Sequence, residues 1–167
     1  MNPDYLPLVA EIGAALAGFG SLAGLIGRGS SSESPEVDAG RLRGMLERAL
    51  AVVLLALLPM ALAQFPISDD AVWWSCGAIV FIASPAMNWS VIYRLRRLPN
   101  YAPGTAYFIS SQVNLALELS LLTAGFLDAV PLASAYGFAL LIELCSAGGM
   151  FLRVVASITS TRGRTAA

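Results

Sequence analysis

Residues 112–122 read QVNLALELSLL, a leucine-rich run with Glu118 near its centre. A carboxylate is costly in hydrocarbon, by about 3 kcal/mol on insertion scales, so a glutamate in a run of this kind needs a physical reason. The whole chain of 167 residues is 57% hydrophobic and only 13% charged, with a mean hydropathy of +0.71. Soluble domains carry nearer ~25% charged residues. We therefore predict a membrane protein with several spans.

Five apolar runs are long enough to cross a bilayer, which takes roughly 20 helical residues. They lie near residues 5–27, 43–65, 71–93, 106–127 and 132–156, with a serine-rich connector at 29–40. Helices are expected because each backbone polar group must be satisfied within its own segment. The predicted fold is all-α, a single transmembrane domain of five helices over residues 1–167.

The charged residues predict an orientation. Aspartates occupy one set of chain ends and loops (Asp4, Asp69, Asp70, Asp128), and arginines flank the other set (Arg28, Arg41, Arg43, Arg94, Arg96, Arg97, Arg162, Arg164). Five spans make the two sets alternate, which places the N-terminus outside and the C-terminus inside. Four spans, with the first helix lying on the surface, would break the alternation. The alanine-rich, lysine-free composition indicates a bacterial inner (plasma) membrane.

Composition also excludes several functions. The chain has no histidine or lysine, and its net charge is −1. We therefore expect no Schiff-base or haem chemistry, no serine–histidine triad and no nucleic-acid partner. Cys76 and Cys145 lie in apolar runs without CxxC spacing and are interpreted as small core residues. No HExxH, GxSxG or GxGD motif is present, so neither an enzyme nor a cofactor is predicted.

The fourth and fifth predicted spans each carry a polar stripe at helical spacing. The first comprises Tyr107, Ser111, Asn114 and Glu118, and the second Glu143, Ser146, Met150 and Arg153. The connection between the spans is short, so the two helices should be antiparallel neighbours. Counted outward from a turn near residue 130, Glu118 pairs with Glu143 at roughly 18–20 Å from the turn. Asn114 pairs with Ser146, Ser111 with Gly149 and Tyr107 with Arg153.

Two carboxylates at one depth near the bilayer centre cannot both be ionised and unpaired. Either they hold at least one proton, or a monovalent or divalent cation lies between them. We therefore predict an ion or proton site formed by Glu118, Glu143, Asn114 and Ser146. The alternative is that a protonated glutamate only joins helices by hydrogen bonds, worth about 1 kcal/mol.

Other residues are less informative. Glu11 lies near the outer end of the first span and could belong to an outer mouth that attracts cations. Glu47 is expected to pair with Arg43 or Arg153, and Asn88 is a single polar residue of low specificity. Small residues recur along the first span (Gly13, Ala17, Gly20, Gly24, Gly27), which predicts close packing, either inside the bundle or between subunits of a homo-oligomer.

Three functions follow from this pattern. The first is an oligomeric cation channel or a proton-linked transporter that uses the intramembrane glutamates. The second is a scaffold or regulatory subunit of a larger membrane complex, in which the polar stripes only hold the helices together. A membrane enzyme is the weakest of the three because no nucleophile or metal ligand accompanies the two glutamates.

Overall fold

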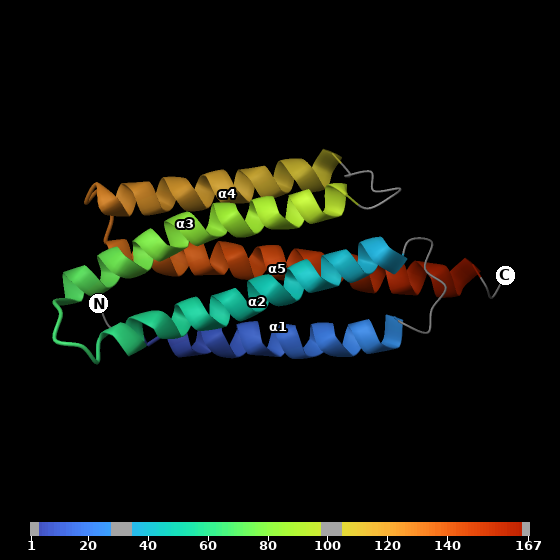
Figure 1. The fold of residues 1–167 in the computed structure, drawn as a ribbon, viewed down its shortest axis with the longest axis horizontal. Helices are drawn as coiled ribbons and strands as arrows, with labels where there is room; N and C mark the ends of the chain where they lie inside the picture. The colour runs from blue at the N-terminus through green and yellow to red at the C-terminus, as the bar shows by residue number, and fades with distance from the viewer. Residues whose placement is uncertain (1–3, 28–34, 98–104, 165–167) are drawn as a thin grey trace.

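The computed structural model describes residues 4–27, 35–97 and 105–164, which form five helices (Figure 1). In chain order these are α1 (Leu6–Gly27), α2 (Pro35–Leu62), α3 (Asp69–Arg96), α4 (Thr105–Phe126) and α5 (Leu132–Arg164). The all-α prediction is confirmed. Four helices, α1, α2, α3 and α5, are long and apolar enough to cross a membrane. The length of α4 is similar to that of α1, but its polar stripe lowers its hydropathy.

The second helix begins before the second predicted span. α2 begins at Pro35, well before residue 43, so the second half of the predicted connector is helical. A proline fits the first position of a helix because its fixed φ is helical and its missing N–H has no partner there. The helix therefore starts in the charged segment and continues into the apolar one. Residues 29–34 of the connector lie outside the described part of the chain.

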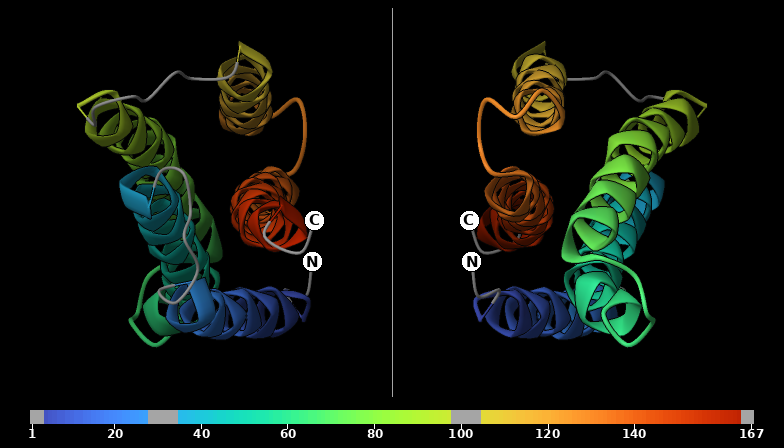
Figure 2. Two further views of the ribbon diagram at one scale, coloured as in Figure 1. Left: turned by 90° about the vertical axis from the view of Figure 1, so that its right-hand side faces the viewer. Right: turned by 90° about the vertical axis from the view of Figure 1, so that its left-hand side faces the viewer.

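α5 is the central helix of the bundle. It packs against all four other helices, whereas α4 packs against α3 and α5 alone within the described residues. Viewed along the bundle, α1, α2 and α3 form a curved wall beside α5, and α4 lies at the edge farthest from α1 (Figure 2). α2 to α5 therefore surround the middle of the bundle.

A tight turn fixes the register of α4 against α5. Asp128 adopts a positive φ of 57° after the last turn of α4. The N–H of Ala129 donates to the carbonyl of Ala124 at 2.9 Å, and the N–H of Asp128 donates to that of Gly125 at 3.2 Å. This is the Schellman pattern of a helix C-terminus. Because the connection is short and closed, the two helices run antiparallel side by side, as predicted.

The small face of α1 packs against α2 within the chain. A Cβ on Gly20 would lie 1.9 Å from Cε of Met45, and one on Gly24 would lie 2.4 Å from Cδ2 of Leu42, both on α2. A Cβ on Gly13 would lie 3.2 Å from the carbonyl oxygen of Ala49. Of the two predicted uses of this face, the structure shows close packing within the bundle.

Two apolar clusters fill the two halves of the bundle. The larger lies toward the end that holds Asp69, Asp70 and Asp128, which we term the aspartate end; it includes Leu6, Val52, Val80, Leu122 and Tyr136. The smaller lies toward the opposite end, which holds Arg43, Arg94, Arg96, Arg97 and Arg153 and is termed the arginine end; it includes Met45, Val91, Leu95 and Met150. The buried polar residues lie between the two clusters.

A cross-helix hydrogen bond supports the larger cluster where α2 contains Pro59. Because proline has no N–H, the carbonyl of Leu55 lacks its usual helical donor. The hydroxyl of Tyr136 on α5 donates to that carbonyl instead. In a membrane interior such a substitute donor is needed, since water is not available to the freed carbonyl.

Candidate functional site

Five polar side chains meet in the middle of the bundle, near the midpoints of their helices. They come from four helices: Arg48 from α2, Ser84 and Asn88 from α3, Glu118 from α4 and Glu143 from α5. Each is at least 95% buried. Charged groups at such a position are rare unless they are paired, because desolvation costs several kcal/mol per ion. We refer to these five residues as the central network.

Glu143 is the hub of the central network. Nη1 of Arg48 forms an ion pair with its Oε2. Its other oxygen, Oε1, lies 2.9 Å from the hydroxyl oxygen of Ser84, and the same hydroxyl contacts Oε1 of Glu118. The two glutamates therefore share one serine, and one of them also holds an arginine.

The shared serine constrains where the protons lie. A hydroxyl has one proton, so Ser84 can donate to only one of its two carboxyl neighbours and must accept from the other. To donate to Ser84, a carboxyl group must itself be protonated. We assign the negative charge to Glu143 because the guanidinium of Arg48 neutralises it. Glu118 is then the protonated carboxyl group. This arrangement gives the central network a net charge of zero.

Further hydrogen bonds extend the network toward the arginine end. Nη2 of Arg48 donates to Oδ1 of Asn88 at 3.1 Å, and Ser111 donates to the same oxygen at 2.7 Å. Asn114 of α4 donates to Ser146 of α5 at 3.1 Å. Nε of Arg48 is the one buried side-chain nitrogen or oxygen, in the ranges that the structure describes, that lacks a protein partner.

The predicted pairing of α4 with α5 agrees with these contacts. Asn114 meets Ser146 directly, and Glu118 meets Glu143 through Ser84. The side chain of Tyr107 lies outside the described part of the structure, so its predicted pairing with Arg153 is not addressed. Glu11 lies on the exposed side of α1 and contributes to neither cavity of the central region.

Sequence reasoning missed Arg48 and Ser84, and it undervalued Asn88. Arg48 lies inside the predicted second span, and a positive charge within a span is itself a signal of function. Nothing in the spacing along α2 indicated which helix it would face. Ser84 carries no comparable signal, because a serine is inexpensive in a membrane helix.

One cysteine prediction was wrong. Cys76 is buried in the larger apolar cluster, as expected, but Cys145 is exposed. Cys145 lines the larger of the two cavities beside the central network. Both cysteines are free thiols, and no group of three or more potential metal ligands occurs in the residues that the structure describes.

Two cavities adjoin the central network. The smaller, about 10 Å³, is lined by four members of the network and four neighbours: Arg48, Asn88, Glu118 and Glu143 with Ser111, Asn114, Leu115 and Ser146. The larger, about 90 Å³, runs between α4 and α5 from Arg48, Asn114 and Ser146 to Arg153 near the arginine end. The larger volume exceeds what one water molecule needs. The larger hollow lies on the arginine side of the central network, and four of the residues that line it are exposed: Ser110, Cys145, Gly149 and Arg153.

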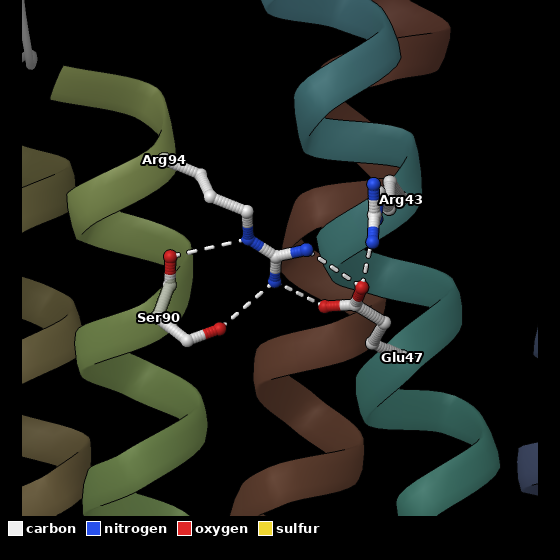
Figure 3. Close-up of polar contacts among 4 residues, drawn as sticks. All are labelled: Arg43, Glu47, Ser90 and Arg94. Atoms are coloured by element: carbon white, nitrogen blue, oxygen red, sulfur yellow. Dashed lines mark hydrogen bonds and ion pairs between the residues drawn. The ribbon is translucent and has the colours of Figure 1, made fainter. Parts of the chain in front are cut away.

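A second ionic cluster lies on α2 and α3 at the arginine end (Figure 3). Glu47 accepts from Nε of Arg43 at 2.8 Å and from Nη1 of Arg94 at 2.7 Å. Arg94 also donates to the hydroxyl of Ser90 at 2.9 Å. The predicted partner Arg43 is confirmed, and the interhelical partner is Arg94 of α3. The side chains of Glu47 and Arg94 remain more than a third exposed, so this cluster is a peripheral ion pair.

Comparison of the chain with protein-family models, with curated proteins and with solved structures finds no match. The functional interpretation therefore depends on the geometry of the central network and of the cavities beside it.

Proposed function

We propose that the chain is a proton-linked membrane transporter in which Glu118 and Glu143 form the proton site. The observation that carries the proposal is the central network itself. Two buried carboxyl groups share the Ser84 hydroxyl, and only one of them is paired with Arg48. A carboxyl group that is neutral in this arrangement can release and regain a proton, and ionisable groups inside membrane spans mark ion and proton paths.

Arg48 favours a proton over a metal cation as the bound species. A sodium or calcium ion between the glutamates would require both carboxyl groups to be ionised. The guanidinium of Arg48 already supplies a permanent positive charge to Glu143, and it would repel a second cation. A proton avoids this conflict because it neutralises Glu118 without needing a coordination shell.

The packing of the bundle favours a transporter over a channel. From the central network to the arginine end there is a polar cavity, whereas the aspartate half is filled by the larger apolar cluster. A channel requires a continuous polar path. A polar hollow on one side of the site and a packed apolar cluster on the other support a transporter in which access to the site alternates.

The proposal includes the membrane arrangement. All five helices cross the bilayer, with α4 tolerated because its polar stripe faces α3 and α5. The arginine end faces the cytoplasm by the positive-inside rule, in a bacterial plasma membrane. A homo-oligomer remains part of the proposal, but the small face of α1 no longer supports it, since α2 covers that face.

The competing function is a scaffold in which the network only joins helices. Its support is that the hydrogen bonds of the network connect α2, α3, α4 and α5. Glutamine keeps the shape of glutamate and can donate to Ser84, so Glu118→Gln separates the two functions. It removes the exchangeable proton and leaves the joining role in place.

The test is proton movement into proteoliposomes that enclose a pH-sensitive dye, with an imposed pH gradient. We expect the wild-type chain to carry protons and Glu118→Gln to lose at least 90% of the initial rate while unfolding at the wild-type temperature in detergent. Glu11→Gln is the matched control, since Glu11 is exposed on α1, and it should retain the rate. Equal rates for Glu118→Gln and wild type, or no protein-dependent rate at all, would leave the scaffold function.

A further inference from the structure

We infer that the arginine half of α4, residues 108–118, is a gate that pivots on the aspartate half of the same helix, residues 119–126. The gate opens the central network toward the arginine end when Glu118 loses its proton, and it closes when Glu118 regains one. This inference deepens the proposed function and rests on it for the transport step, but the movement can be measured without transport. It is carried by the different packing of the two halves of α4.

The aspartate half of α4 is fixed by close apolar packing. Leu122 is fully buried in the larger apolar cluster, and the ring of Phe126 lies 4.8 Å from the ring of Trp74 on α3. A Cβ on Gly125 would lie 2.8 Å from Cδ1 of Leu132, the first residue of α5. The tight turn between α4 and α5 closes this end as well. Packing of this density leaves little room for the helices to separate here.

The arginine half of α4 is held by polar contacts instead. The smaller apolar cluster, which fills the arginine end of the bundle, draws its described members from α2, α3 and α5 and none from α4. Ser111 donates to Asn88 of α3, and Asn114 donates to Ser146 of α5. Ser110 makes a further polar interaction. Hydrogen bonds between membrane helices are individually weak, so this half can leave its neighbours more easily than the other.

Both cavities beside the central network are bounded by the arginine half of α4. Ser111 and Asn114 line the smaller and the larger cavity, and Glu118 lines the smaller one. On the facing wall, Ser146 of α5 also lines both. An outward movement of the arginine half therefore joins the two cavities. It brings Glu118 into contact with a hollow whose lining is partly exposed.

The charge of Glu118 sets the position of the gate. While Glu118 is protonated, its hydrogen bond with Ser84 joins α4 to α3, and the central network is neutral. Without that proton, two buried carboxylates share one serine and one guanidinium, that of Arg48. An uncompensated charge in a dry interior is far costlier than the loss of a few hydrogen bonds. Outward movement of α4 hydrates the carboxylate and separates it from Glu143.

Few other groups near α4 carry charge or titrate. Those that face it from the helices packed against it are Glu143, Cys145 and Arg153 of α5 and Arg96 of α3, with Arg48 of α2 behind Glu143. The arginines stay charged across the accessible pH range, and the thiol is removed in the labelling background below. A change of pH therefore acts on this interface through Glu118 and Glu143.

Distances between paired spin labels measure the movement in detergent, in a chain whose two native cysteines are replaced by alanine. The first pair joins Ile109→Cys on the arginine half of α4 to Leu50→Cys on α2. The matched pair joins Thr123→Cys on the aspartate half to Leu57→Cys on α2. All four positions are exposed. Between about pH 5 and about pH 10, the first distance should lengthen by about 5 Å or more, and the second should change by less than about 2 Å.

Two variants connect the movement to the proton. Glu118→Gln keeps the hydrogen-bonding shape without an ionisable proton, so the first distance should stay short at every pH. Glu11→Gln, on the exposed side of α1, is the matched control and should show the wild-type change. A lock gives an independent test if Glu118→Gln does not fold. A disulfide between Asn114→Cys and Ser146→Cys, whose native side chains are hydrogen-bonded at 3.1 Å, should hold the first distance short at high pH, and reduction should release it.

The outcomes separate this inference from the proposed function. Lengthening of the first distance alone at high pH, without proton flux in the wild type, would support the gate and reject proton transport. Proton flux with both distances independent of pH would overturn the gate alone. Equal changes in both pairs would mean that α4 moves as one body, and an unaltered change in Glu118→Gln would mean that another group controls the movement. Either of these last two results would overturn the inference.

Discussion

Glu47 and Arg48 are consecutive residues on α2, yet their side chains lie in opposite environments. Glu47 points toward α3 at the arginine end and forms an ion pair with Arg94 that is more than a third exposed (Figure 3). Arg48 points into the bundle, is 95% buried and pairs with Glu143. A rotation of about 100° per residue around the helix is enough to separate a peripheral ion pair from a central one.

The difference lies in solvation rather than in the chemistry of the groups. At the periphery, water and salt screen the charges, so making or breaking the pair changes the free energy little. In the centre, each charge has lost its hydration, and removing one partner leaves the other uncompensated. Of the two pairs, only the central one carries a large energy when its charge changes, so the proposed proton site depends on that pair.

The largest effect is expected from Arg48→Met, which leaves the carboxylate of Glu143 buried without its partner. We expect a loss of about 3–5 kcal/mol in the free energy of unfolding, measured by thermal or denaturant unfolding in detergent. Replacing both Arg48 and Glu143 by methionine should recover most of the stability. Arg43→Met, on the exposed side of α2, is the control. If Arg48→Met and Arg43→Met were equally stable, the central and peripheral ion pairs would not differ in energy as described.

A smaller effect is expected from Ser84→Ala, which removes the hydroxyl shared by Glu118 and Glu143. The carboxyl groups lose a buried hydrogen-bond partner, at a cost of about 1–3 kcal/mol. Unfolding in detergent measures the loss, and infrared spectroscopy of the carboxyl stretch should show a shifted band for the protonated group. Ser75→Ala, at an exposed position of the same helix, should change neither quantity. An unshifted carboxyl band would show that Ser84 does not bind the protonated group.

Glu47→Gln should cost at most about 1 kcal/mol, because the pair with Arg94 is partly exposed. High salt screens exposed charges, so the difference from wild type should diminish between dilute buffer and about 1 M salt. The same salt series on Arg48→Met should show no such convergence. A salt-independent loss of several kcal/mol in Glu47→Gln would mean that the peripheral pair behaves as a buried one.

Arg43→Gln should have the smallest effect, about 0.3–0.5 kcal/mol. Arg43 is four residues from Glu47 on the same helix, and its side chain is 71% exposed, so it adds little to the bond that Arg94 already makes. Chemical unfolding of the single and double variants of Arg43 and Arg94 measures the coupling. A coupling above about 1 kcal/mol would show that the three residues act as one network.

The sequence by itself determined the number and approximate limits of the helices, the segregation of aspartates and arginines to opposite ends, and the register of α4 against α5. These features depend on local spacing: apolar run length, helical periodicity and a short connection whose closure leaves one antiparallel arrangement. Glu118, Glu143, Asn114 and Ser146 could be paired because both stripes are tied to the same turn.

Only the tertiary structure decided what α2 and α3 contribute to the site. Arg48, Ser84 and Asn88 reach the glutamates because of how α2 and α3 are rotated about their own axes. The sequence does not predict that rotation, because neither helix is tied to its neighbours by a turn as short as the one between α4 and α5. The exposure of Cys145 and the cavity beside it have the same origin. Rotation is set by the fit of many side chains across interfaces, such as the glycine face of α1 against α2, and that fit is a property of the assembled bundle.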